Sequence, residues 1–594
     1  MSHRRSRVLG CVIALLSALA LVVPGCASLP DSSSPQAIGT IDRGPATTEV
    51  PAPEPGREPD LLLRDFLQAS TNPANRHVAA RQFLTSEMSA RWDDAASATI
   101  VDKVDVLAEE RDGNTATYVV RANIVGHLEE GGLYRADNGD LEAKFSLVRD
   151  NGEWRIDETP PGVIMDKARF LNSYQRRSLY FVTPSGSTVV PDPRWISGTP
   201  EQAATQLIGL LIEGPKPSLA PAVHNELADT TILGPITKAD GRTSQVGVGL
   251  GGIRVDFGGL ASLAEPAREL LAAQVIWTLA NAEIAGPYVL LSDGQPLDER
   301  YPNGWTTADV ATMNPLATSG TPIGLHALLG GSLVSVAETG VTPVQGFFGS
   351  VDNLRSVGMS RDGALLAAVA DTGRPAPEPA AELVVGAYND GSPEPAVEGA
   401  SITRPSWAPD GNSVWAVVNG TAVVRAVREP GSGRVTVVGV EAGAIRALGG
   451  RISELRLSRD GVRAAMIIDG RVYIAIVVQT PNGEFSLTSP REIAFDLGGP
   501  ALSLDWSTSD TVVVSRSASD IPVVQIAIDG SRMDALPSRN LTPPVVAVEA
   551  STTTEYVADT RAVFQLNNSD PAGDRYWREV PGLAGLTAEP VLPG

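Results

Sequence analysis

The sequence predicts a multidomain protein of mixed α+β and all-β class, with a C-terminal β-propeller. Its 594 residues correspond to about three or four domains. A Pro-rich segment separates an apolar N-terminus from the rest, and the C-terminal part repeats a turn motif about every 50 residues. With 43% hydrophobic residues, 58 Gly and 45 Pro, the chain is globular and rich in turns. This composition excludes collagen, a coiled coil and wholesale disorder.

The charge and aromatic content argue against a nucleic-acid partner. The formal net charge is −22, from 47 basic and 69 acidic residues. A surface of that sign repels a phosphate backbone. Aromatic residues make up only 5% of the chain, which leaves few rings for stacking on bases.

Residues 1–25 have the pattern of a lipoprotein signal peptide. Three arginines precede an apolar run over residues 8–23, which is shorter than the roughly 20 residues that span a bilayer. Gly25-Cys26 at the end of this run resembles the bacterial lipobox. The resemblance implies that Cys26 carries a diacylglycerol, that cleavage precedes it, and that the new N-terminus is acylated, for example with palmitate. The other interpretation is an ordinary signal peptide with an incidental cysteine; Cys11, the only other cysteine, lies in the segment that would be removed.

Residues 26–59 would form the lipidated cysteine and a Pro/Ser-rich tether. The segment shows no apolar periodicity, and its reach is about 30 Å if flexible and up to about 100 Å if polyproline-like. We therefore expect the protein to be lipid-anchored to the extracytoplasmic face of the cell membrane. A single remaining cysteine cannot form a disulfide within the mature chain.

Residues 60–165 predict a small α+β domain. Apolar spacing indicates a helix around residues 61–67 and a second one over residues 78–92. Strands are expected over residues 115–125 and 142–148, with a hairpin turn at Asp150-Asn151-Gly152 into a strand over residues 153–157. This order is similar to the α+β folds of the nuclear transport factor kind.

Residues 168–298 predict a β–α–β–α–β order. Strands are expected over residues 178–182, 252–257 and 288–291, and a helix over residues 265–282. Another helix starts at the N-cap Thr199, with Pro200 in its first turn and Gln202 completing a capping box. The segments LYFVTPSG, LLIEGP, IRVDF, QVIWTLA and VLLSDGQPL resemble the GerMN domain. That resemblance implies an extracytoplasmic interaction or scaffold module, with no catalytic residues to transfer.

Residues 321–594 contain the repeat. A Ser-x-Asp-Gly-like turn precedes an apolar strand in each copy, and the aspartates follow at intervals of 48, 50 and 50 residues. They are Asp362, Asp410, Asp460 and, in a degenerate copy, Asp510. A period near 50 with about four short strands is typical of a propeller blade, so we expect five blades, or six. The copy SWAPDG resembles the WD40-like repeats of TolB-type propellers.

The sequence contains no complete motif for catalysis, cofactor binding or metal binding. Residues 247–252 (GVGLGG) satisfy Gly-x-Gly-x-x-Gly, but a strand pattern follows directly where a dinucleotide site needs a helix, so a loop is expected. His77, His127, His224 and His326 lack metal-ligand spacing, and the repeated Asp-Gly pairs lack the alternating ligands of a calcium loop. We predict no enzyme, no catalytic residue, no cofactor and no metal.

The order of lipobox, tether, α+β domain, GerMN-like domain and propeller resembles the LpqB family of actinobacterial lipoproteins. The resemblance implies an accessory of two-component signalling that binds the extracytoplasmic part of an MtrB-like sensor histidine kinase. It would thereby affect phosphorylation of the regulator MtrA, cell division and envelope homeostasis. Two alternatives stay open: a solute- or glycan-binding lipoprotein that uses the propeller channel, and, more remotely, an envelope hydrolase. The sequence does not identify the residues that contact a partner.

Overall fold

The computed structural model describes residues 53–260, 262–317, 323–389 and 391–594. The segment Ala52–Gly594 forms one compact unit. The expected signal peptide, Cys26 and most of the expected tether lie outside the described residues. Within the described ranges, no helix is both long enough and apolar enough to cross a membrane.

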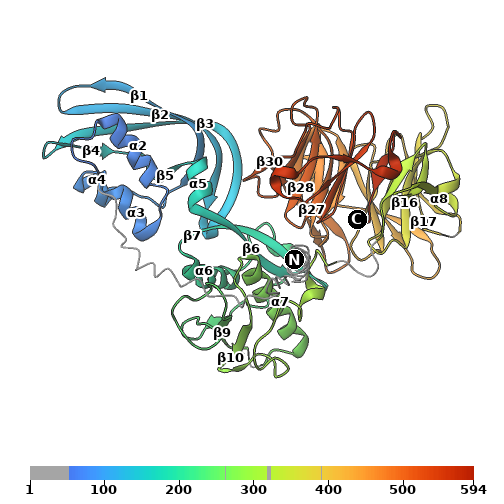
Figure 1. Ribbon diagram of the computed structural model, residues 1–594, viewed down its shortest axis with the longest axis horizontal. Coiled ribbons are helices and arrows are strands. Elements are labelled where there is room, and N and C mark those ends of the chain that lie inside the picture. Colours follow the sequence, from blue (N-terminus) through green and yellow to red (C-terminus); the bar gives the residue numbers. More distant parts are fainter. Residues whose placement is uncertain (1–52, 261, 318–322, 390) are drawn as a thin grey trace, which may run out of the picture. The chain divides into compact units, whose positions relative to one another are not determined.

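The first folded region is a curved five-stranded sheet with short helices on one face (Figure 1). Its order is β4-β3-β2-β1-β5; β5 runs parallel to β1, and the other pairs are antiparallel. Phe66, Trp92 and Phe145 pack in the core between helices and sheet. The elements are α2 (Pro59–Ala69), α3 (Ala74–Arg81), α4 (Ser86–Arg91), β1 (Ala98–Arg111), β2 (Thr115–Glu129), β3 (Leu133–Asp150), β4 (Glu153–Glu158) and β5 (Val163–Asp166).

The predicted hairpin turn in this region is confirmed. Asn151 and Gly152 have φ angles of 52° and 85°, the pair of positive values that a two-residue type I′ turn requires. The helix predicted over residues 78–92 is instead two short helices, α3 and α4. The long strand β1 was not predicted, because its second half is exposed and charged and lacks an apolar face.

The middle region has the predicted order of strands and helices. The parallel strands β9 and β10 flank α7, in a sheet of order β11-β10-β9-β8. The backbone N–H of Thr199 donates to Gln202 Oε1 at 3.1 Å, which is one arm of the predicted capping box. The elements are α5 (Lys167–Ser173), β6 (Tyr174–Val182), β7 (Val189–Ser197), α6 (Pro200–Glu213), β8 (Thr231–Ile232), β9 (Ile253–Gly258), α7 (Glu265–Asn281), β10 (Tyr288–Ser292) and β11 (Gln295–Pro296).

One feature of the middle region has no counterpart in the sequence prediction. The strand expected over residues 178–182 is β6, but it pairs with β7 in a separate two-stranded antiparallel sheet. Pro191 and Pro193 stand inside β7, and proline lacks the N–H that a strand ladder uses. The sequence therefore gave no signal for this strand.

Within the described residues, the C-terminal region contains six four-stranded antiparallel sheets. The strands are β12 (His326–Leu329), β13 (Ser332–Ala337), β14 (Gly340–Pro343), β15 (Leu354–Met359), β16 (Leu365–Asp371), β17 (Ala381–Ala387), β18 (Glu394–Gly399), β19 (Ser406–Trp407), β20 (Ser413–Val418), β21 (Ala422–Arg428), β22 (Val435–Gly439), β23 (Ile452–Leu457), β24 (Arg463–Ile468), β25 (Arg471–Gln479), β26 (Phe485–Glu492), β27 (Ala501–Thr508), β28 (Thr511–Arg516), β29 (Val523–Ala527), β30 (Met533–Ala535), β31 (Ala547–Ala550), β32 (Thr554–Ala558), β33 (Val563–Asn567), β34 (Arg578–Glu579) and β35 (Glu589–Val591). Two short helices, α8 (Phe347–Ser350) and α9 (Gly443–Arg446), lie between sheets.

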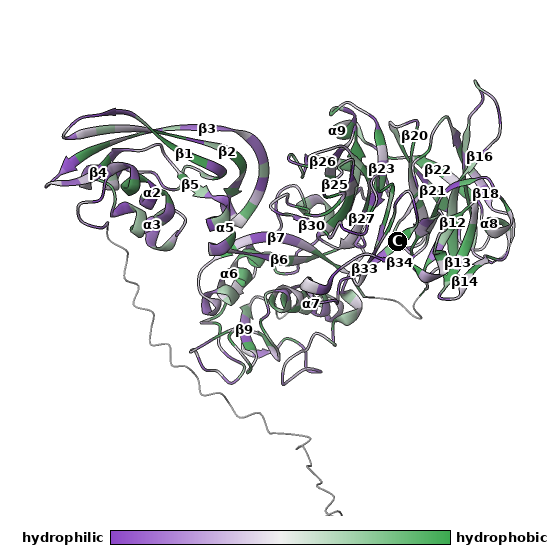
Figure 2. Ribbon diagram, turned by 45° about the horizontal axis from the view of Figure 1, so that its top comes forward, coloured by the Kyte–Doolittle hydropathy of each residue, from purple (hydrophilic) through white to green (hydrophobic). Residues whose placement is uncertain are grey.

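These sheets form a closed β-propeller. The strands β15, β19, β23, β27, β31 and β35 each contact the next in turn, and β35 contacts β15. Because β35 completes the sheet of β12, β13 and β14, the last strand of the chain closes the ring. The strands carry much of the hydrophobic colour in Figure 2, as strands packed between neighbouring sheets should.

Tryptophans of the repeat hold neighbouring sheets together. Trp407 Nε1 donates to Gly358 O at 3.0 Å, and Trp506 Nε1 donates to Arg456 O at 3.0 Å. A Cβ on Gly358 would lie 2.4 Å from Pro405 O, so only glycine permits this close approach of the two sheets. The repeat is therefore a packing motif as well as a turn motif.

Candidate interaction surfaces

The repeated aspartates form turns, as predicted. Asp460 Oδ1 accepts hydrogen bonds from Ser458 Oγ at 2.6 Å and from the N–H of Val462 at 2.9 Å. Asp362 accepts the same two bonds from Ser360 and Ala364, at 2.6 and 3.0 Å. The described residues contain no cluster of three or more His, Cys, Asp or Glu side chains that could hold a metal ion.

A network of buried charges closes the propeller axis. The innermost strands β23, β27 and β31 supply Glu454, Asp505 and Glu549, and Arg404 precedes β19. The guanidinium of Arg404 lies 2.5 Å from a carboxylate oxygen of Glu454 and 2.5 Å from one of Glu549. Arg456 pairs with Asp505 at 3.1 Å. All five side chains are at most 13% exposed, so the axis is filled by ion pairs between different blades.

Burial and mutual repulsion set the protonation of this network. Burial opposes ionisation of Asp505, but Arg456 and Arg404 hold the pKa of its carboxyl below its usual value. Burial, together with the neighbouring carboxylates of Asp505 and Glu454, raises the pKa of Glu549 to about 7 against the attraction of both arginines. A ligand that entered the axis would have to break these ion pairs.

A second buried charge cluster joins the β6–β7 hairpin to the propeller. Arg176 of β6 lies 2.8 Å from Asp510 and 3.2 Å from Asp529. The indole N–H of Trp195, in β7, donates to Asp529 at 3.1 Å. The guanidinium of Arg463, in β24, donates to the carbonyl of Pro191. We call the cluster of Arg176, Trp195, Asp510 and Asp529 the hairpin junction.

Apolar contacts surround the hairpin junction. Val462 and Ile476 of the propeller belong to the same buried cluster as Leu179 and Phe181 of β6. Burial opposes ionisation of Asp510 and Asp529, but the positive charge of Arg176 lowers the pKa of both carboxyls. The middle region and the propeller are thus held by apolar packing and by fully ionised pairs.

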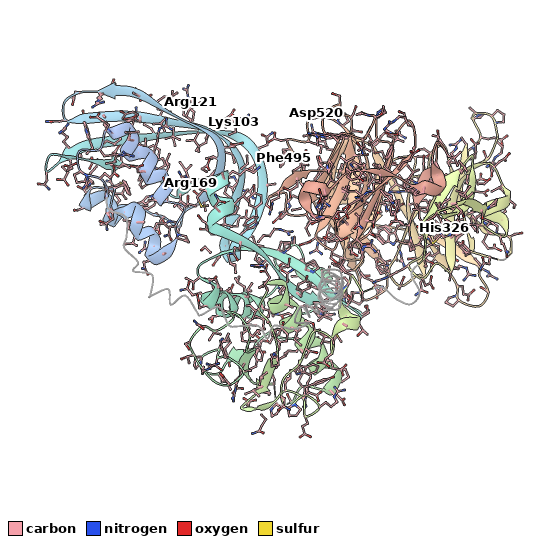
Figure 3. All side chains as sticks on the ribbon, viewed as in Figure 1. Lys103, Arg121, Arg169, His326, Phe495 and Asp520 are labelled. Carbon is pink, nitrogen blue, oxygen red and sulfur yellow. The ribbon has the colours of Figure 1, made fainter. Side chains whose placement is uncertain are left out.

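The remaining residues that the sequence analysis considered lie apart from one another. The glycine-rich segment 247–252 runs directly into β9, and no helix begins there, so it is a loop as predicted. His77 packs edge-on against Trp92. His326, labelled in Figure 3, lies 2.6 Å from the Tyr388 hydroxyl. His224 bonds through its backbone to Val182.

One histidine lies between a hydroxyl and a carboxylate. His127 Nε2 is 3.0 Å from Asp137 Oδ2, and its Nδ1 is 3.5 Å from Thr99 Oγ1. The order resembles a hydrolytic triad, but 3.5 Å is too long to activate a hydroxyl. Arg135 also binds Asp137, at 3.3 Å, and competes with the imidazole for that carboxylate. The arrangement joins β2 to β3 through the contact of His127 with Asp137.

Sequence reasoning missed both buried charge clusters. Their partners are far apart in the chain: Arg176 and Asp510 are 334 residues apart. A signal existed only for the axis. Arg404 and Glu454 each stand six positions before the turn aspartate of their repeat copy, Arg404 just before β19 and Glu454 within β23. A charged residue at the same position in two repeat copies could have been interpreted as part of a charge network along the propeller axis.

The folded regions correspond to three known domain families. The match to "Lipoprotein LpqB, N-terminal domain" covers residues 52–171, and the match to "Sporulation and spore germination" covers residues 178–298. The match to "Lipoprotein LpqB beta-propeller domain" covers residues 331–593. The chain is 69% identical to Lipoprotein LpqB of Rhodococcus jostii (strain RHA1) over 594 residues, which is 100% of this chain and 99% of the relative. The chain belongs to the LpqB lipoprotein family.

Other comparisons agree with membership of the LpqB family. Lipoprotein LpqB of Nocardia farcinica is 50% identical, with all of both chains covered. Among solved structures, a putative TolB from Agrobacterium tumefaciens is 19% identical and covers 35% of this chain and 76% of its own, with a TM-score of 0.27. That TM-score is too low for the likeness to bear on the fold. The names of the LpqB relatives describe lipoproteins and mention no partner.

Proposed function

We propose that this LpqB-family protein is acylated at Cys26 and anchored to the extracytoplasmic face of the cell membrane. We propose further that its folded part binds the extracytoplasmic domain of an MtrB-like sensor histidine kinase. Through that contact it modulates phosphorylation of the regulator, and with it cell division and envelope homeostasis. Full-length similarity to the LpqB family carries the proposal.

Two physical features support a role in binding another polypeptide. The tether that the sequence predicts, with a reach of about 30–100 Å, would keep the folded part near membrane partners and raise the effective concentration for binding them. The hairpin junction fixes the middle region against the propeller through buried ion pairs of 2.8 and 3.2 Å. A partner that binds either domain therefore meets a preorganised surface, which lowers the ordering cost of association.

The buried ion pairs weigh against a solute- or glycan-binding role that uses the propeller channel. A sugar in the axis would have to replace the contacts of Arg404 with Glu454 and Glu549, both of 2.5 Å. Removing one partner of such a buried pair costs about 3–5 kcal/mol, which few small neutral ligands could offset.

The test is direct binding between purified proteins. The folded part, from residue 60 onward, is titrated into the extracytoplasmic domain of the sensor kinase in a calorimeter at tens of micromolar. We expect saturable binding to the MtrB-like domain and none to the extracytoplasmic domain of an unrelated sensor kinase. No heat with the MtrB-like domain, or equal heat with both, would contradict the proposal. Crosslinking to the kinase in intact cells extends the test to the anchored protein.

A further inference from the structure

The outer rim of the propeller carries a groove between its last two complete meanders. A cavity of about 900 Å³ is lined by residues 535–540, which follow β30, and by residues 573–578, which lead into β34. A second cavity of about 710 Å³ adjoins it and shares part of its lining. The shared residues are Arg539, Asn540, Tyr576, Trp577 and Arg578. We call the two cavities together the rim groove; the strands β30 and β34 are labelled in Figure 2.

Arginines are concentrated along the rim groove, although the chain as a whole is strongly acidic. Four arginines line it (Arg539, Arg561, Arg575 and Arg578), against two carboxylates (Asp574 and Glu579). The whole chain, by contrast, has a net charge of −22. An arginine that is not paired with a carboxylate can attract an anionic ligand and orient it during encounter.

Within the described residues, two of the four arginines form no ion pair. Arg578 is paired with Asp570 at 2.5 Å, and Arg561 is paired with Asp559 at 3.1 Å. The guanidinium of Arg575 donates only to backbone carbonyls, at 3.0 and 2.6 Å, which fixes its position without neutralising it. Arg539 is exposed, and within the described residues its guanidinium meets no carboxylate. Arg539 and Arg575 are therefore available to an incoming carboxylate.

The floor of the rim groove is rigid. Trp577 is only 1% exposed, and its indole N–H donates to Pro537 O at 2.6 Å, while its carbonyl accepts from Asn540 Nδ2 at 2.7 Å. These bonds tie the two walls together. Above the floor, Tyr576 is 48% exposed, and the Arg578 guanidinium lies 4.3 Å from its ring centroid. An exposed tyrosine beside arginines on a preformed base is the composition of a binding hot spot.

The walls of the rim groove favour an extended ligand. β30 and β34 are the outermost strands of their sheets, so each has one edge without a strand partner. Ala535 ends β30 and Arg578 begins β34, and both line the groove. An extended peptide can add main-chain hydrogen bonds at such an edge, and its side chains on one face repeat every second residue.

We propose that the rim groove binds an extended acidic peptide segment of another polypeptide, whose Asp or Glu side chains pair with Arg539 and Arg575. The segment lies along the edge of β30 or β34 and packs on Tyr576. This site goes beyond the proposed function: it names a position and a ligand class, and it holds whether or not the kinase is the partner.

The experiment measures fluorescence anisotropy with the full chain in a neutral detergent. The probe is a labelled peptide of about a dozen residues that alternates Glu with Thr, and the matched probe replaces each Glu by Gln. We expect the Glu peptide to bind and the Gln peptide not to bind, with affinity falling as salt rises. Arg539→Ala should weaken binding about tenfold, and Tyr576→Ala should also weaken it. Arg434→Ala, which removes an exposed arginine from another blade, should leave it unchanged.

Several outcomes would overturn the proposal. These are equal binding of both peptides, no binding of the Glu peptide, or equal losses in Arg539→Ala and Arg434→Ala. Polyphosphate and vesicles of anionic phospholipid are tested in parallel. If either binds in a manner that depends on Arg539 while the Glu peptide does not, the groove is a phosphate site and the peptide assignment is wrong. Circular dichroism of each variant separates a lost contact from a lost fold.

Discussion

Replacing Arg176 by methionine should destabilise the folded unit far more than the loss of an ordinary surface ion pair. Arg176 lies 2.8 Å from Asp510 and 3.2 Å from Asp529, whose side chain is only 5% exposed. Methionine fills similar space but removes the positive charge beside the buried Asp529 and the partly buried Asp510, and breaking a buried pair costs about 3–5 kcal/mol. Arg491 still attracts Asp529 and reduces this cost. Because Trp195 still donates to Asp529, we expect a loss near 3 kcal/mol in the free energy of unfolding.

The measurement is urea unfolding of the wild type, Arg176→Met and the control Arg532→Met. Arg532 pairs with Asp534 at 3.6 Å, and both side chains are more than half exposed, so the control should lose less than about 1 kcal/mol. Arg176 lowers the pKa of Asp510 and Asp529 in the folded protein. The stabilisation by these ion pairs is therefore present above the pKa that the two carboxyls have in the unfolded chain, and it is lost as the pH falls through their pKa in the folded protein. The difference between wild type and Arg176→Met should therefore shrink below about pH 4. Equal losses in the two variants, or a loss that does not change with pH, would refute the role given to the hairpin junction.

Three further predictions concern the anchor, the repeat and the axis. Cys26→Ala should move the protein from the membrane fraction to a soluble or uncleaved form, and unchanged detergent-dependent fractionation would contradict lipid anchoring. Asp460→Ala should lower the free energy of unfolding by about 3–5 kcal/mol, because it leaves Arg463 buried beside a broken turn. Asp410→Ala, at an exposed turn, should lower it by about 1 kcal/mol. Similar urea midpoints for the two variants would be inconsistent with this reasoning. Glu549 has a pKa raised to about 7, so the folded state loses stability as the pH rises from about 4.5 to 7. Glu549→Gln should remove that loss, so in urea titrations the stability of the variant relative to wild type should be higher near pH 8 than near pH 5. A difference in stability that does not change with pH would count against the axis network.

Elements that depend on local chemistry were predicted from the sequence. The turn at Asn151-Gly152 follows from two residues that tolerate positive φ, and the start of α6 follows from Thr199 and Gln202. The repeat of turn aspartates located four of the six meanders, because each copy carries its own Asp, its own strand and, in two copies, its own tryptophan. In each case the residues that form the structure are neighbours in the chain.

Elements that depend on distant partners were not predicted. The sheet of β12 is completed by β35, in which Val591 stands opposite His326, and neither segment carries the repeat. Similarly, β7 contains Pro191 and Pro193 and is stabilised by its pairing with β6 and by contact with the propeller. Periodicity reports which face of a segment is buried and says nothing about which remote segment covers it. The two charge clusters escaped the analysis for the same reason.

Two groups of arginines in this acidic chain have different roles. One group stabilises the fold, and the other is proposed to recognise a ligand. Arg176 and Arg404 are largely buried, and each is paired with two carboxylates from other parts of the fold. In a mature chain that the sequence predicts to lack disulfides, such contacts add to apolar packing in fixing the domains and closing the ring. Arg539 and Arg575 instead line the rim groove, and within the described residues neither forms an ion pair. Loss of Arg176 or Arg404 should thus lower the stability and leave the affinity of the folded protein for acidic peptide unchanged. Loss of Arg539 should weaken that affinity and leave the stability unchanged.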